Sequence, residues 1–146
     1  MRQWIVEIPG RPVGKESVDE GQGRRHRAPK TEAFMAMVSW YGKQAGLKPV
    51  GHCIIDIYGC YPVRIEKGME VEPKVRADED NITKGIKDAW HGILYKNDKV
   101  VIWGERGYLF IDHDQLPYTR VVITECEWTD FRVRKEETNG VKETCR

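Results

Sequence analysis

The sequence lacks any long apolar run. No stretch approaches the roughly 20 apolar residues that a membrane-spanning helix needs. The N-terminal segment MRQWIVEIPG is interrupted by Glu7 and Pro9, so it does not form the apolar core of a signal peptide. Charged residues make up 32% and hydrophobic residues 40% of the 146-residue chain, which is typical of a water-soluble globular domain. We therefore predict a cytoplasmic protein.

Cysteine is scarce, and its spacing fits no metal site. The chain has 4 cysteines, which form neither a C-x-x-C pair nor a zinc-finger pattern. Cys53, Cys60 and Cys126 fall in strand-like segments, and Cys145 lies in a polar tail. We predict that all of them are reduced thiols, the first three serving as small apolar residues.

An excess of positive charge is also missing. The formal net charge is only +1, so overall charge cannot drive nucleic-acid binding, and any such binding must use local patches. Basic residues do gather in a glycine-rich segment between residues 10 and 30, and another precedes an acidic motif. A loop that is merely solvated fits this composition equally well. The candidate DNA-binding residues are Lys15, Arg24, Arg25, Arg27, Lys30 and Arg76.

Hydrophobic periodicity predicts an α+β fold. We expect a single two-layer domain in which two main helices pack on one face of a mixed β-sheet. The domain should span residues 1–128, and residues 129–146 should form a polar tail. Residues 63–77 are expected to be a charged loop. The expected strands are 3–8, 52–62, 100–105, 108–111 and 119–128, with a bend at Arg106 and Gly107, and the expected helices are 31–45 and 81–91.

The second predicted helix has recognisable end signals. Asp80 or Asn81 can act as its N-cap, because either side chain can accept a hydrogen bond from a free N–H group of the first turn. Gly92 is a natural C-terminal stop. The helix should therefore begin directly after a D-x-D sequence.

Acidic residues cluster at the start of this helix. Asp78 and Asp80 are two residues apart, so in an extended segment their side chains would point the same way. Lys84 follows one helical turn later and can reach back towards them. Asp98 precedes an apolar strand that could run back beside the helix start. These four residues are the candidate catalytic set.

An all-oxygen cluster of this kind suits magnesium or manganese better than zinc. Such an ion could activate water and neutralise charge on a phosphodiester, and Lys84 could stabilise the transition state. A calcium loop is excluded, because Ile82 stands where an oxygen ligand is needed. The competing interpretation is a solvated acidic turn in which Asp80 caps the helix and Lys84 is its ion-pair partner.

A longer pattern supports the first interpretation. From residue 78 the chain reads DEDNITK, then DAWHGIL, then NDKVV. This order resembles the D-x-D-N-x-x-K, D-A-L-x-G and D-D-x-Q-V signature of RusA-type Holliday junction resolvases. The resemblance implies that Asp78, Asp80 and Asp98 hold magnesium and that Lys84 is needed for cleavage. Asn97 and Val100 depart from the signature.

The resemblance also implies an activity. It predicts a magnesium-dependent endodeoxyribonuclease that forms a homodimer and resolves four-way junctions by paired symmetric nicks, leaving 5′-phosphate and 3′-hydroxyl ends. Manganese could replace magnesium. Roles in DNA recombination and repair would follow. The alternative is a DNA-structure-binding module that keeps the fold without catalysis.

Overall fold

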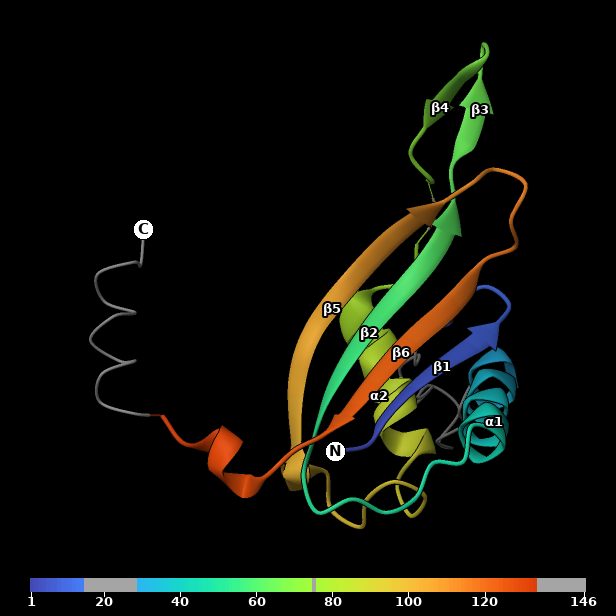
Figure 1. The fold of residues 1–146 in the computed structure, drawn as a ribbon. Helices are drawn as coiled ribbons and strands as arrows, with labels where there is room; N and C mark the ends of the chain where they lie inside the picture. Colours follow the sequence, from blue (N-terminus) through green and yellow to red (C-terminus); the bar gives the residue numbers. More distant parts are fainter. Residues whose placement is uncertain (15–28, 75, 134–146) are drawn as a thin grey trace, which may run out of the picture.

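A four-stranded sheet organises the chain, and both long helices lie on one of its faces (Figure 1). The structure is a computed structural model that describes residues 1–14, 29–74 and 76–133. The elements are β1 (Gln3–Pro9), α1 (Pro29–Gln44), β2 (Cys53–Pro62), β3 (Arg64–Glu66), β4 (Met69–Val71), α2 (Glu79–Ala89), η1 (Asp98–Val100), β5 (Val101–Ile111), β6 (Tyr118–Glu125) and η2 (Trp128–Phe131). The predicted α+β class is confirmed.

The sheet is mixed, with strand order β1-β6-β2-β5. β6 is antiparallel to both β1 and β2, whereas β5 runs parallel to β2. The parallel pair needs a crossover, and α2 provides it on the helical face of the sheet (Figure 1). Between these two parallel strands the chain runs back along α2, so the start and the end of this helix lie beside different parts of the sheet.

The core lies between the sheet and the helices. Alternate strand residues face it, as the period of two along a strand requires, and they meet the apolar side of α2. The fully buried side chains include Ile8, Ile55, Ile82, Ile86 and Ile123. None of the helices within the described ranges is long and apolar enough to cross a membrane.

The cysteines behave as small core residues. Cys53 and Cys60 are buried and Cys126 is half-buried, and all three are free thiols, as predicted. Burial raises the pKa of Cys53 to about 12, so this thiol stays protonated and unreactive at neutral pH. Cys145 lies outside the described residues.

At Gly42, α1 packs closely against Trp90, which directly follows α2. A Cβ atom at Gly42 would lie 2.7 Å from the indole Nε1 of Trp90 and 3.0 Å from Cδ1 of Leu47. Trp90 cannot move away freely, because it is fully buried and its indole N–H donates a 3.0 Å hydrogen bond to the carbonyl of Val38. Glycine is therefore needed here for packing.

We expect Gly42→Ala to lower the free energy of unfolding by about 1–2 kcal/mol, because overpacking outweighs the better helix propensity of alanine. Urea denaturation followed by circular dichroism would measure this. Ala36→Gly, at an exposed site on the same helix, is the control for propensity alone. A gain in stability for Gly42→Ala would show that the helices can separate at little cost.

The predicted bend at Arg106 and Gly107 is wrong, because β5 is one continuous strand of 11 residues. Its register against β2 shifts between Ile55 and Ile57, where β5 accommodates an extra residue. At this bulge the backbone N–H of Glu105 donates a 2.7 Å hydrogen bond to the Asp56 carboxylate. A bulge and a hairpin both interrupt the alternation of side chains, which explains the incorrect prediction.

The predicted charged loop at 63–77 is also incomplete, because it contains the hairpin β3–β4. Lys67 and Gly68 both have positive φ, 52° and 77°, as expected for a tight turn that matches strand twist. The hairpin projects from the end of the sheet (Figure 1). At the other end of the chain β6 stops at Glu125, short of the predicted boundary at 128, and the tail is described only as far as Val133.

Candidate active site

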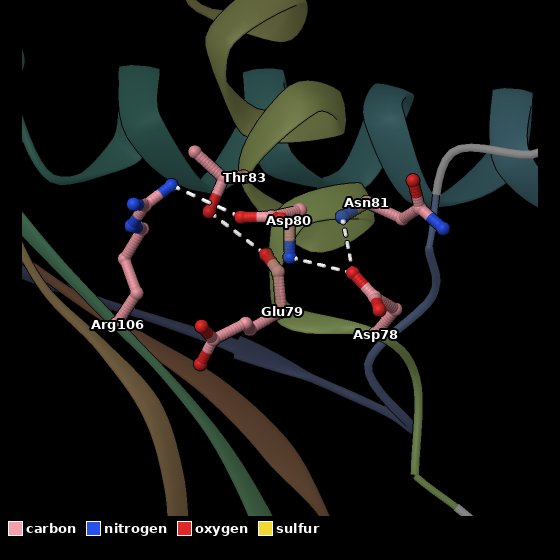
Figure 2. Close-up of polar contacts among 6 residues, drawn as sticks. All are labelled: Asp78, Glu79, Asp80, Asn81, Thr83 and Arg106. Carbon is pink, nitrogen blue, oxygen red and sulfur yellow. Dashed lines mark hydrogen bonds and ion pairs between the residues drawn. The ribbon is translucent and has the colours of Figure 1, made fainter.

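Helix α2 begins at an acidic cap. Asp78 has extended backbone angles, φ −62° and ψ 131°, and is the N-cap. Its Oδ1 accepts hydrogen bonds from the backbone N–H groups of Asp80 at 2.9 Å and Asn81 at 3.3 Å (Figure 2). The prediction that Asp80 or Asn81 caps the helix is therefore wrong. The earlier residue takes this role because its carboxylate satisfies two first-turn donors at once.

The shifted helix start changes where Asp80 points. Asp80 lies in the first turn, where residues two apart are rotated by roughly 200° about the helix axis. In Figure 2 the Asp78 and Asp80 carboxylates consequently project to opposite sides of the helix start. The expectation that they point the same way does not hold, because it assumed an extended segment.

Arg106 of β5 faces Asp80, a contact that was not predicted from the sequence. Its Nη1 donates to Oδ1 of Asp80 at 3.2 Å (Figure 2). Both side chains keep substantial exposure, 36% for Arg106 and 64% for Asp80, so the ion pair is screened and weak. Continuous alternation through β5 was the only available signal, and the bulge concealed it. Arg106 adds a cation beside the acidic residues.

Two tyrosines hold the segment before the cap. The hydroxyl of Tyr61 on β2 accepts a 2.8 Å hydrogen bond from the backbone N–H of Ala77. The hydroxyl of Tyr108 on β5 donates a 2.7 Å hydrogen bond to the Ala77 carbonyl. Both backbone groups of Ala77 are thus fixed to the sheet, which positions Asp78 independently of the helix.

Lys84 lies on the exposed side of α2, one turn after Asp80. Within the described parts of the chain it makes no hydrogen bond or ion pair, and Asp80 is paired with Arg106 instead. The competing interpretation of an Asp80 to Lys84 ion pair is therefore not observed. An ammonium group with no partner among the described residues can engage a ligand without breaking a contact to any of them.

Asp98 lies elsewhere, at the start of η1. Its Oδ2 is 2.7 Å from the Nζ of Lys87 in the last turn of α2, and this hydrogen bond lowers the pKa of Asp98. Lys87 is seven residues beyond Asp80, about 10 Å of helical rise. Asp98 therefore does not join Asp78 and Asp80. In the described ranges no group of three or more His, Cys, Asp or Glu residues could hold a metal ion.

The acidic residues nevertheless suit magnesium by their chemistry. Magnesium is usually bound through one or two carboxylates, with waters and substrate phosphates completing the shell. Asp78 and Asp80 are exposed, and only Oδ1 of Asp78 is used by the cap. Each carboxylate can therefore serve as one ligand of such an ion, but because the two project to opposite sides of the helix start, both reach the same ion only after a side chain rotates.

Of the predicted DNA-binding residues, Lys30 and Arg76 are described. Lys30 is exposed in the first turn of α1, and Arg76 lies two residues before Asp78. Lys15, Arg24, Arg25 and Arg27 lie outside the described residues. Gly14, just before them, packs so closely on Asn81 that a Cβ atom there would be 2.9 Å from the Asn81 Cβ. Gly14, the last described residue before this segment, therefore lies beside the start of α2.

A comparison with protein families places this geometry in context. The family model described as Endodeoxyribonuclease RusA matches residues 9–124. The match covers most of the chain and includes Asp78, Asp80, Lys84, Asp98 and Arg106. No curated protein matches the chain.

Proposed function

The chain belongs to the RusA endodeoxyribonuclease family, and from that premise we propose that it is a magnesium-dependent resolvase of four-way DNA junctions. Membership makes it a hydrolase that acts on DNA. The observation that supports a magnesium-dependent resolvase is the exposed start of α2. Asp78 and Asp80 lie there, and Lys84 follows one helical turn later. Carboxylates that can bind a metal ion and a lysine that can contact phosphate oxygens are together suited to hydrolysis of a phosphodiester.

The proposed reaction is an in-line attack of water on phosphorus. The bond from phosphorus to the 3′ oxygen breaks, which leaves a 5′-phosphate and a 3′-hydroxyl. A magnesium or manganese ion held by Asp78 and Asp80 would supply charge neutralisation and water activation. Lys84 donates to the phosphate oxygens as negative charge develops on them. In the absence of DNA, Arg106 partly neutralises the negative charge of Asp80 through their ion pair.

We include Asp98 as a third metal ligand. In the structure its carboxylate is engaged by Lys87, about 10 Å of helical rise from Asp80, so it serves the same metal only when that ion pair opens and η1 moves towards the start of α2. Because the pair is partly exposed, opening costs little. Substitutions of Asp98 and of Lys87 should therefore have different effects on cleavage.

Asp98→Asn should reduce magnesium-dependent cleavage strongly, by about a hundredfold or more if a metal ligand is lost. Lys87→Ala, which removes only the partner of Asp98, should leave cleavage unchanged or raise the apparent affinity for magnesium. Magnesium titrations of the single-turnover rate would measure both. Equal losses in the two variants would instead show that the ion pair matters as a structural contact.

A homodimer completes the proposal. Resolution requires two nicks in strands related by the symmetry of the junction, and a two-fold dimer presents two equivalent sites. The biological roles would be DNA recombination and repair. The other candidate function is a DNA-structure-binding module without catalysis, which the retained residues Asp78, Asp80 and Lys84 do not favour.

Turnover of a labelled four-way junction tests the proposal against this alternative. The wild-type chain should cut the junction with magnesium, leave it uncut with EDTA, and leave a linear duplex of the same sequence largely intact. Tight junction binding without cleavage at any magnesium or manganese concentration would favour the binding module.

A further inference from the structure

A row of side chains extends along β5 from the acidic site towards the projecting hairpin. Arg106, Tyr108 and Phe110 alternate along the strand and share its helix-facing side. Arg106 reaches Asp80, and Tyr108 reaches the Ala77 carbonyl. From residue 106 to residue 110 the row covers about 13 Å of strand. We call these three residues the β5 row.

The outer end of the β5 row is not covered by a helix. α2 begins level with Arg106, as the ion pair to Asp80 shows, so the strand beyond that point projects past the helix start. Phe110 remains 45% exposed there. An exposed aromatic ring on the helical face of a sheet is unusual, because that face normally packs against the helix.

Arg76 stacks on this uncovered end. Its guanidinium carbon is 5.1 Å from the centroid of the Tyr108 ring and 5.5 Å from that of Phe110. Both distances fall within the range of cation–π contacts. Its ion-pair partner Glu72 has Oε2 4.0 Å from Nη2 of Arg76 and a side chain that is 68% exposed, so the guanidinium is only weakly neutralised.

The combination of rings and cations identifies a ligand class. Exposed aromatic rings offer stacking surfaces to unpaired bases, and neighbouring arginines contact the phosphates of the same strand. A protein partner would not require two cations beside the rings, Arg106 next to Tyr108 along the strand and Arg76 over both rings. Paired duplex bases are already stacked on each other and cannot use the ring face. The matching substrate is therefore a strand whose bases are accessible, as at a branch point.

We propose, resting on the junction-cleaving function above, that the β5 row with Arg76 holds the DNA strand next to the cut, and that Phe110 stacks on a base exposed at the branch. Arg106 and Arg76 contact the phosphates on either side of that base. Phe110 thereby becomes a specificity residue, because it favours branched over linear DNA. It does not touch the scissile phosphate and takes no part in the chemistry.

The test is a thermodynamic cycle between Phe110 and the branch base, measured by binding in EDTA so that cleavage plays no part. Four-way junctions are prepared with and without abasic sites at the nucleotides flanking the branch. Phe110→Ala and Phe110→Leu remove the ring, and Phe110→Trp keeps a stacking face. Trp128→Ala removes a 61% exposed aromatic from η2, which follows the end of β6 beside the start of β2, away from the β3–β4 hairpin, and is the control. Circular dichroism verifies folding.

Phe110→Ala and Phe110→Leu should each weaken binding of the intact junction by about tenfold, and change duplex binding by less than about twofold. Phe110→Trp and Trp128→Ala should bind as the wild type does. The abasic junction should cost the wild type a similar factor but cost Phe110→Ala nothing further, because the interaction is already lost.

Additive losses in the cycle, or unchanged binding by Phe110→Ala and Phe110→Leu, would overturn the stacking role. The proposed function has a separate outcome, because it is measured by wild-type cleavage in magnesium. A wild-type protein that cuts junctions while the cycle is additive would remove only Phe110 from the account. A protein that binds without cutting, yet shows a coupled cycle, would remove only the catalytic proposal.

Discussion

Asp80→Asn should abolish junction cleavage at saturating magnesium while junction binding stays the same or becomes tighter. The substitution removes a metal ligand. It also removes a negative charge that faces the phosphates and frees Arg106 from its ion pair. Folding should be undisturbed, since Asp78 rather than Asp80 caps α2. Single-turnover cleavage and binding in EDTA would measure the two effects separately.

Glu79→Gln is the matched control for Asp80→Asn. It makes the same acid-to-amide change at the neighbouring residue, which the proposed mechanism does not use. The control should retain cleavage within a few-fold of the wild type. Cleavage by Asp80→Asn at a near wild-type rate would contradict the assignment of Asp80, and so would equal losses in both variants.

Lys84→Ala should reduce the single-turnover rate by about two orders of magnitude, comparable to the loss of one preorganised transition-state donor. Junction affinity should change little, because the loss lies in chemistry. Lys84 is exposed and makes no ion pair within the described ranges, so its removal breaks no structural contact there. Rapid-quench measurements with enzyme in excess would isolate the chemical step.

Lys84→Arg provides a second reading, because it keeps the charge but changes the geometry of the donors. Partial activity would show that charge is sufficient for part of the effect. Lys43→Ala, at an exposed lysine in the last turn of α1, controls for the general loss of positive charge. Full activity in both Lys84 variants would remove Lys84 from the mechanism and leave a site of metal and carboxylates alone.

Much of the fold could be predicted from local patterns. The period of two in β1, β2 and β6 and the helical spacing in α1 and α2 reflect which side chains face the core, so these elements were found within a few residues. The helices on one face of a mixed sheet followed from their order. The ordered motif between residues 78 and 101 identified the family that the family model also matches.

Contacts between distant segments could not be read in the same way. The position of Arg106 opposite Asp80 depends on the register of β5, and a bulge opposite Asp56 shifts that register by one residue. The relative direction of the Asp78 and Asp80 side chains depends on the residue at which α2 begins. Because the helix start was predicted two residues too late, the two side chains were wrongly expected to point the same way. Asp98 pairs with Lys87 because η1, which lies between α2 and β5, places Asp98 beside the last turn of α2.

The most direct test of the junction-resolving site follows all four strands of one junction. Each strand is labelled in turn at its 5′ end, the junction is incubated with wild-type protein and magnesium, and the products are mapped to the nucleotide and treated with ligase. We expect nicks at symmetric positions in two opposed strands, which ligase seals because they carry a 5′-phosphate and a 3′-hydroxyl. Cuts in single or unrelated strands, products that ligase cannot seal, or equal cutting in EDTA would contradict the account.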